Sequence, residues 1–130
     1  MSIHERGVKP PLKPDADALK KAPTPPRYLD RHAKAEWRRI MPQLIGRRVI
    51  TRADLAGVEN YCIQIGYVRQ IEEQRAAAGS AIDPKLFGVL NRAAQTARQL
   101  AAEYGLSPTS RARIGAAQPA DDDDDNPLSV

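Results

Sequence analysis

The sequence of 130 residues has few of the residue types on which most enzyme and metal sites depend. It contains one cysteine, Cys62, and two histidines, His4 and His32, and no pair of these has the spacing of metal ligands. A single cysteine also excludes an internal disulfide and fits a reducing compartment. The glycine-rich phosphate loop and the usual hydrolase and zinc-protease motifs are absent as well. We therefore expect no metal, no cofactor and no catalytic site.

Long apolar runs are also lacking. No stretch approaches the roughly 18 consecutive apolar residues that a membrane span needs. The first six residues carry charge but are not followed by an apolar core, so they do not read as a secretory signal. We therefore place the protein in a cytoplasm.

Basic residues outnumber acidic ones, and the charges are unevenly distributed along the sequence. The net charge is +4, but five of the 16 acidic residues are Asp121 to Asp125. Residues 1–120 hold the other 11 acidic residues and all 20 basic residues, so their net charge is +9. A basic body indicates a polyanionic partner, and an acidic tail indicates an interaction or solubilising segment.

The two ends of the chain differ in composition from its middle. Residues 1–27 hold six of the 11 prolines and six basic residues, including Lys20 and Lys21. Few apolar groups are available there, so we predict a disordered, basic, proline-rich arm with at most a short helical turn at 16–21. The arm either follows DNA phosphates or is a plain solvated linker. Residues 116–130 are predicted to form a disordered acidic tail.

The middle, residues 28–115, is predicted to be one all-α domain organised around a long helix over residues 51–78. Thr51 and Asp54 have the spacing of a capping box at its start. Cys62 lies on its apolar stripe and is expected to be a buried small hydrophobe. The stripe recurs every three or four residues and consists of Leu55, Val58, Tyr61, Cys62, Ile65, Val68 and Ile71.

An earlier helix is predicted over residues 30–45, with Asp30 as its N-cap. Trp37 lies on its apolar stripe and is expected to anchor the core. Pro42 should kink or end the last turn, and Gly46 should close the helix in a left-handed conformation.

A later helix is predicted over residues 84–104, where apolar and alanine positions alternate in steps of four and three. We expect it to return antiparallel along the long helix as a helical hairpin. Gly105 should end it, with Leu106 folding back as in a Schellman motif. Residues 107–114 should add one short capped turn.

The densest positive stretch runs from Arg31 to Arg52 and contains a single acid, Glu36. Arginine suits phosphate groups and guanine edges, so this stretch predicts DNA contact. The alternative is an ordinary solvated face with local pairs such as Glu36 with Arg39. With the arm, the candidate DNA-binding residues are Arg31, Lys34, Arg38, Arg39, Arg47, Arg48, Arg52, Lys20 and Lys21.

Several short segments, taken in order, resemble one known family. They are Pro26-Arg27-Tyr28-Leu29, then residues 35–40 and 49–55, then Tyr61-Cys62, and last residues 103–113 with the motif Gly-Leu-Ser-Pro-Thr-Ser-Arg-Ala-Arg. The set resembles the small terminase subunits of tailed double-stranded-DNA bacteriophages and prophages. The resemblance implies a ring of roughly eight to twelve subunits, without catalysis, in the bacterial host cytoplasm. Such a ring binds viral DNA at the packaging start and recruits and regulates the large subunit, which carries the ATPase and nuclease.

Under this hypothesis the two longer helices supply the subunit interfaces. The candidate oligomerisation residues are Leu55, Val58, Ile65, Val68, Leu86, Leu90, Ala93, Ala97 and Leu100. Leu128 and Val130 are candidates for docking on the large subunit; the alternative for this tail is solubility or competition with DNA.

Two other functions fit the composition. A helix-turn-helix transcription regulator would present Arg52, Asn60 and Gln64 to bases. A purely structural helical adaptor would use its basic residues for solubility alone and would bind no DNA.

Overall fold

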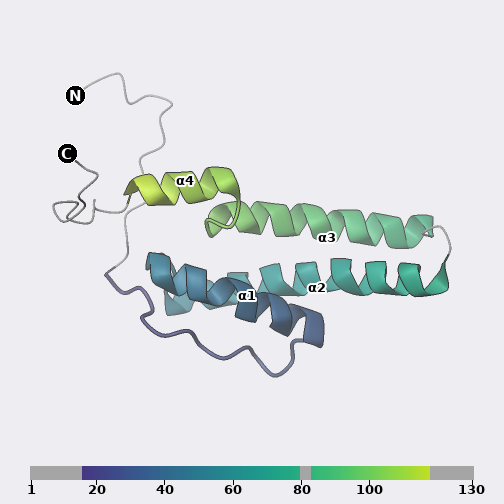
Figure 1. Cartoon of the computed structure of the whole chain (residues 1–130), viewed down its shortest axis with the longest axis horizontal. Helices are drawn as coiled ribbons and strands as arrows, with labels where there is room; N and C mark the ends of the chain where they lie inside the picture. The colour runs from purple at the N-terminus through teal and green to yellow at the C-terminus, as the bar shows by residue number, and fades with distance from the viewer. Residues whose placement is uncertain (1–15, 80–82, 118–130) are drawn as a thin grey trace, which may run out of the picture.

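The structure is a computed structural model that describes residues 16–79 and 83–117, with side chains as far as Arg113 (Figure 1). The prediction of an all-α fold is confirmed, since no strand occurs in these ranges. The elements are α1 (Arg31–Arg47), the short 3-10 helix η2 (Arg52–Asp54), α2 (Leu55–Ala78), α3 (Pro84–Glu103) and α4 (Pro108–Ala117). None of these helices has the length and apolar character that a membrane span requires.

Helix α2 is the centre of the fold. Figure 1 shows α3 lying beside it along much of its length, α1 packed across its first half, and α4 following at the end of α3. The main core lies where the three longer helices meet, and its fully buried side chains include Trp37, Leu44, Val58 and Cys62. The burial of Trp37 and Cys62 confirms both predictions. Ala97 of α3 is also buried in this core, and its small side chain allows α3 to approach closely.

Helix α1 begins as predicted but ends later. The Asp30 carboxylate accepts a hydrogen bond from the Ala33 amide at 2.8 Å. The helix does not end at Pro42 but continues to Arg47, and the left-handed residue that closes it is Arg48, with φ 55°, rather than Gly46. The helix therefore does not end early and Gly46 does not close it, because burial of Leu44 stabilises the last turn more than Pro42 weakens it.

The caps of the two longer helices agree with the sequence patterns. The Asp54 carboxylate accepts a hydrogen bond from the Thr51 amide at 2.8 Å, although the first turn is 3-10 rather than α. At the end of α3, Gly105 has φ 71° and the Leu106 amide donates to the Ala101 carbonyl at 2.8 Å. A Schellman motif has two hydrogen bonds, and this is the one that spans more residues. The predicted motif therefore ends α3. A single short turn was predicted at 107–114, but this region forms helix α4, which extends to Ala117.

The arm differs most from the prediction. The Leu19 amide donates to the Ile50 carbonyl at 2.9 Å, and the Trp37 indole N–H donates to the Pro23 carbonyl at 2.9 Å. The leucine side chain packs against the core. Residues 16–27 are therefore bound to the helices rather than disordered, and of residues 16–21 only 16 and 17 form a turn, without a helix. The rest of the arm, residues 1–15, lies outside the described residues, as do residues 118–130 with Leu128 and Val130.

Candidate nucleic-acid interface

The single acid of the basic stretch, Glu36, is the centre of a buried network. Its side chain is fully buried and accepts hydrogen bonds from Arg39 Nε at 2.7 Å, Tyr61 Oη at 2.7 Å and Arg69 Nη2 at 2.9 Å. The predicted Glu36–Arg39 pair therefore forms, but around a buried carboxylate rather than on a solvated face. The contributions of Tyr61 and Arg69 were missed because they come from α2, 25 and 33 residues away.

The electrostatics of this network keep it ionised. Burial by itself would raise the pKa of the Glu36 carboxyl, but hydrogen bonds from Arg39 and Tyr61 and the charges of Arg39 and Arg69 outweigh burial and lower that pKa. Burial and the hydrogen bond to Glu36 raise the pKa of the Tyr61 phenol, so its hydroxyl stays a donor. Glu36 thus joins α1 to α2 through charged hydrogen bonds.

Three of the candidate DNA-binding arginines have structural partners inside the chain. Arg39 donates through two nitrogens to Glu36, and Arg31 forms an ion pair with Glu73 of α2. Arg47 donates to the Gly105 carbonyl and thereby ties the end of α1 to the segment between α3 and α4. These three side chains therefore already stabilise the fold of the chain.

The other six candidates differ in this respect. Within residues 16–79 and 83–117, no hydrogen bond or ion pair engages the side chains of Lys20, Lys21, Lys34, Arg38, Arg48 and Arg52. Five of them are exposed and Lys34 is half-buried.

The arm brings part of this set together. Lys20, Lys21 and Arg52 line one open hollow of about 630 Å³, together with Asp17 and apolar residues of the arm. The bond from Leu19 to Ile50 holds the arm beside the connection between α1 and η2, where Arg48 lies. We call Lys20, Lys21, Arg48 and Arg52 the basic surface. In the sequence, the two lysines and the two arginines are almost 30 residues apart.

The candidate oligomerisation residues fall into three groups. Val58, Ala93 and Ala97 are buried within the chain itself. Leu86 is 41% exposed, and its neighbours Phe87 and Val89, which the sequence pattern did not single out, are 54% and 41% exposed. The remaining candidates, which are partly covered, are Leu55, Ile65, Val68, Leu90 and Leu100. The apolar surface that another molecule can reach therefore includes the start of α3.

The described residues hold no group of three or more histidine, cysteine or acidic side chains that could bind a metal ion. Burial raises the pKa of the Cys62 thiol to about 12, so the thiol is neutral and inaccessible. Two residues of the regulator hypothesis bond to each other, since Gln64 Nε2 donates to Asn60 Oδ1 at 2.9 Å.

The fold and the surface together define a class: a small protein that is helical in its described residues and carries basic side chains clustered on its surface. Comparison with protein-family models matches residues 33–121 to the family "Phage terminase, small subunit". The chain belongs to this family, which confirms the resemblance and gives the chain a role in phage DNA packaging. The small-subunit family is in general non-catalytic, the ATPase and nuclease belonging to the large subunit. Comparison with curated proteins and with solved structures found no match.

Proposed function

We propose that this chain binds viral double-stranded DNA at the packaging start, assembles into a ring and recruits and regulates the large terminase subunit in the host cytoplasm. The observation that carries the proposal is the basic surface of a member of the small-terminase family: Lys20, Lys21 and Arg52, from two distant segments, line one hollow, and Arg48 lies on the adjoining connection between α1 and η2. None of the four side chains has a partner within the described residues. The hairpin of α2 and α3, with its helices antiparallel, supplies the assembly surface.

The basic surface fits phosphate groups better than base edges. Exposed lysine and arginine side chains suit the backbone of DNA, where most protein–DNA hydrogen bonds are made. Arg38 on α1 is a further exposed cation for the same backbone. Arg31, Arg39 and Arg47 belong instead to the subunit structure, because a phosphate would have to displace Glu73, Glu36 or the Gly105 carbonyl.

The test is charge reversal at two positions, Arg48→Glu with Arg52→Glu. We expect DNA affinity, measured by fluorescence anisotropy on a duplex fragment, to fall at least about tenfold, with the oligomer mass unchanged. The matched control, Arg75→Glu with Arg98→Glu, makes the same charge change at exposed positions of α2 and α3 and should cost less than about threefold. Equal losses would mean that only net charge matters and would overturn the assignment. A wild-type chain that binds no duplex would overturn the DNA-binding function and favour the adaptor.

For the C-terminal segment we propose that Leu128 and Val130, which follow the five aspartates in the sequence, dock on the large subunit. A chain that stops at Ala120 should then recover less large subunit in a pull-down than the full chain. Equal recovery by the two chains would exclude this role. The truncated chain should keep its DNA affinity or gain some, since it loses five negative charges.

A further inference from the structure

Five consecutive aspartates, residues 121–125, begin four residues after α4 ends at Ala117, and we call them the aspartate run. Five adjacent carboxylates repel one another, and residues 114–130 contain no basic residue that could pair with them. Their counter-charge must come from salt ions, from another molecule or from the body of this chain. The position at which α4 ends decides which cations of the same chain the run can reach.

The described chain ends close to the basic surface. Arg47, which precedes Arg48 at the end of α1, donates to the carbonyl of Gly105, three residues before α4 begins. Arg111 in the first turn of α4 lies near the same guanidinium, because burial and then the positive charge of Arg111 lower the pKa of Arg47. Figure 1 shows that α4 ends at the same end of the long axis of the molecule at which α1 ends and the described arm begins.

The chain after α4 is long enough to return to this surface. Helix α4 has ten residues, so it carries the chain about 15 Å from the segment between α3 and α4. An extended chain spans about 3.3 Å per residue, so Asp121 can lie about 13 Å and Asp125 about 26 Å beyond Ala117. The run can therefore fold back as far as Arg48 and the lysines of the arm. So short a tether holds it at an effective concentration on the order of millimolar.

The charges at this end of the molecule are complementary to the run. Residues 16–21, 47–54 and 103–113 meet here through the hydrogen bonds that hold the arm and the end of α1. These three segments contain three acids and seven cations, a net charge of +4; the acids are Asp17, Asp54 and Glu103, and the cations are Lys20, Lys21, Arg47, Arg48, Arg52, Arg111 and Arg113. Carboxylates and phosphates both accept charged hydrogen bonds from lysine and arginine, so a surface that suits DNA also suits the run.

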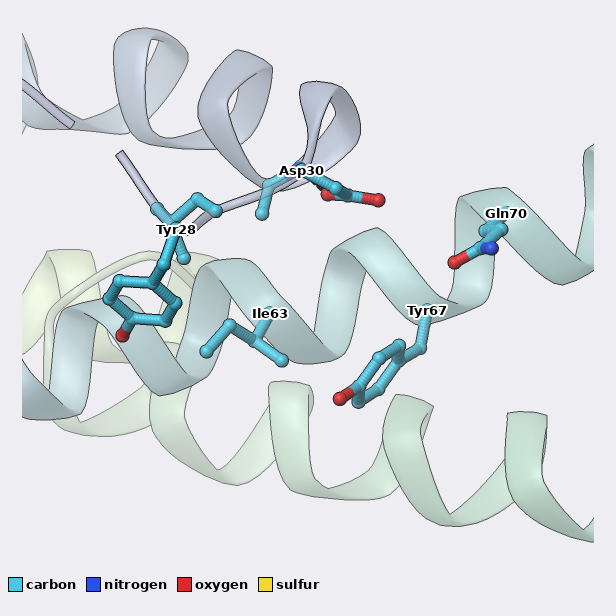
Figure 2. Close-up of a pocket in the computed structure, with 7 residues that line it drawn as sticks. Tyr28, Asp30, Ile63, Tyr67 and Gln70 are labelled. Atoms are coloured by element: carbon cyan, nitrogen blue, oxygen red, sulfur yellow. Dashed lines mark hydrogen bonds between the residues drawn. The ribbon is translucent and has the colours of Figure 1, made fainter. Parts of the chain in front are cut away.

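A second hollow, of about 240 Å³, lies where the segment before α1 meets α2, and its chemistry does not suit the run. Figure 2 shows Ile63 between the rings of Tyr28 and Tyr67, so the hollow is largely apolar. Asp30 also lines it, and Glu59 accepts a hydrogen bond from Tyr28 Oη at 2.7 Å. Carboxylates beside an apolar floor repel an anionic segment, which leaves the basic surface as the better site.

We propose that the aspartate run of each chain lies on the basic surface of that same chain when DNA is absent and is displaced when DNA binds. The carboxylates take the places of DNA phosphates, so this inference rests on the proposed binding of DNA by the basic surface. The run and the duplex are alternative occupants, and each weakens the binding of the other by the same factor. Displacement also releases Leu128 and Val130, so DNA binding makes them available to the large subunit.

The first experiment is carbodiimide cross-linking of the full-length chain, which joins a carboxylate to a lysine amine only where the two are in contact. We expect links from the aspartate run to Lys20 or Lys21. Lys85, exposed at the other end of the long axis, is the internal control and should give none. Excess duplex DNA should remove the links. In a mixture of isotope-labelled and unlabelled chains the links should join residues of one chain, and links between chains alone would overturn the same-chain contact.

The second experiment measures duplex affinity by fluorescence anisotropy at low salt. Asp122→Asn with Asp124→Asn should raise the affinity about threefold or more, and the gain should shrink as salt screens the run from the surface. The matched control, Glu72→Gln with Asp83→Asn, removes the same charge at exposed positions of α2 and of the start of α3. It should change the affinity by less than about 1.5-fold, because asparagine also caps a helix and neither site adjoins the basic surface.

Two results would overturn this contact while DNA binding stands: equal gains in the two double variants, which would mean that only net charge matters, or the absence of links to Lys20 and Lys21. A wild-type chain and a double variant that both bind no duplex would instead overturn the proposed DNA-binding function. The cross-links do not depend on DNA, so the two failures are distinguishable.

Discussion

At the scale of single residues, Glu36 has a larger structural role than its position in the basic stretch of the sequence suggests. One carboxylate receives hydrogen bonds from two arginines and a tyrosine and is fully buried. A buried carboxylate is costly unless it is fully paired, and here every buried side-chain polar atom among the described residues has a partner. Replacing Glu36 should therefore destabilise the packing of α1 against α2.

We expect Glu36→Ala to lower the free energy of unfolding by about 3 kcal/mol, because the buried Tyr61 hydroxyl loses its acceptor and the arginines lose their shared anion. Urea denaturation followed by Trp37 fluorescence measures the change. The control is Glu72→Ala, whose pair with Arg75 is about half exposed and should contribute less than about 0.5 kcal/mol. Equal effects of the two substitutions would contradict a structural role for the network.

The same residue predicts a pH dependence. In the folded chain the pKa of the Glu36 carboxyl lies below its usual value of 4.5, so the unfolded chain binds the proton first as pH falls. The stability that ionised Glu36 adds is therefore complete above about pH 4.5 and is lost as pH falls through the folded pKa. The difference in unfolding free energy between wild type and Glu36→Gln should shrink over that range. A difference that stays constant from neutral pH to about pH 3 would argue against the ionised network.

At the scale of elements, the packing of α1 on α2 depends on Gly66. A Cβ at this position would lie 3.2 Å from Asp30 Oδ1 and 3.3 Å from the Ala33 amide nitrogen, which together form the N-cap of α1. Backbone atoms at a helix start move little without loss of the cap. The glycine is therefore required by the close approach of two helices rather than by its own backbone conformation.

Gly66→Ala should lower the free energy of unfolding by about 1–2 kcal/mol through overpacking. Gly46→Ala is the matched control, since a Cβ there meets nothing within 4 Å and the residue is inside α1. It should raise stability by up to about 1 kcal/mol, because alanine has the higher helix propensity. Thermal unfolding of the two variants beside wild type measures the contrast, and the packing argument fails if both are stabilised.

At the scale of the whole molecule, the net charge of +4 conceals a basic body of which only part is available for DNA. Four phosphate contacts by the basic surface of one subunit predict a slope of about −3.6 for log affinity against log salt concentration. A ring that engages several subunits should show a steeper slope. Arg48→Glu with Arg52→Glu should make the slope shallower by about 2, and a slope near zero in wild type would exclude phosphate binding as the main interaction.

The sequence by itself determined the helices and most of their ends. The Asp30 cap, the Thr51–Asp54 pair and the turn at Gly105 and Leu106 were all predictable, because each depends on residues at most five positions apart. The family was also readable, since its motifs are short stretches in a set order. The end of α1 was not predictable, because packing of Leu44 overrode the local signals of Pro42 and Gly46.

Only the tertiary structure decided which cations serve the fold and which are available to a partner. Arg39 and Arg48 are equivalent in a sequence pattern, but the first is bound to a carboxylate that α2 also contacts, and the second has no partner in the described chain. Likewise the arm is held by Ile50 and Trp37, which are 31 and 14 residues from the groups they bind. Such pairings depend on how helices cross and on burial from several sides at once, and the local periodicity of a sequence does not contain that information.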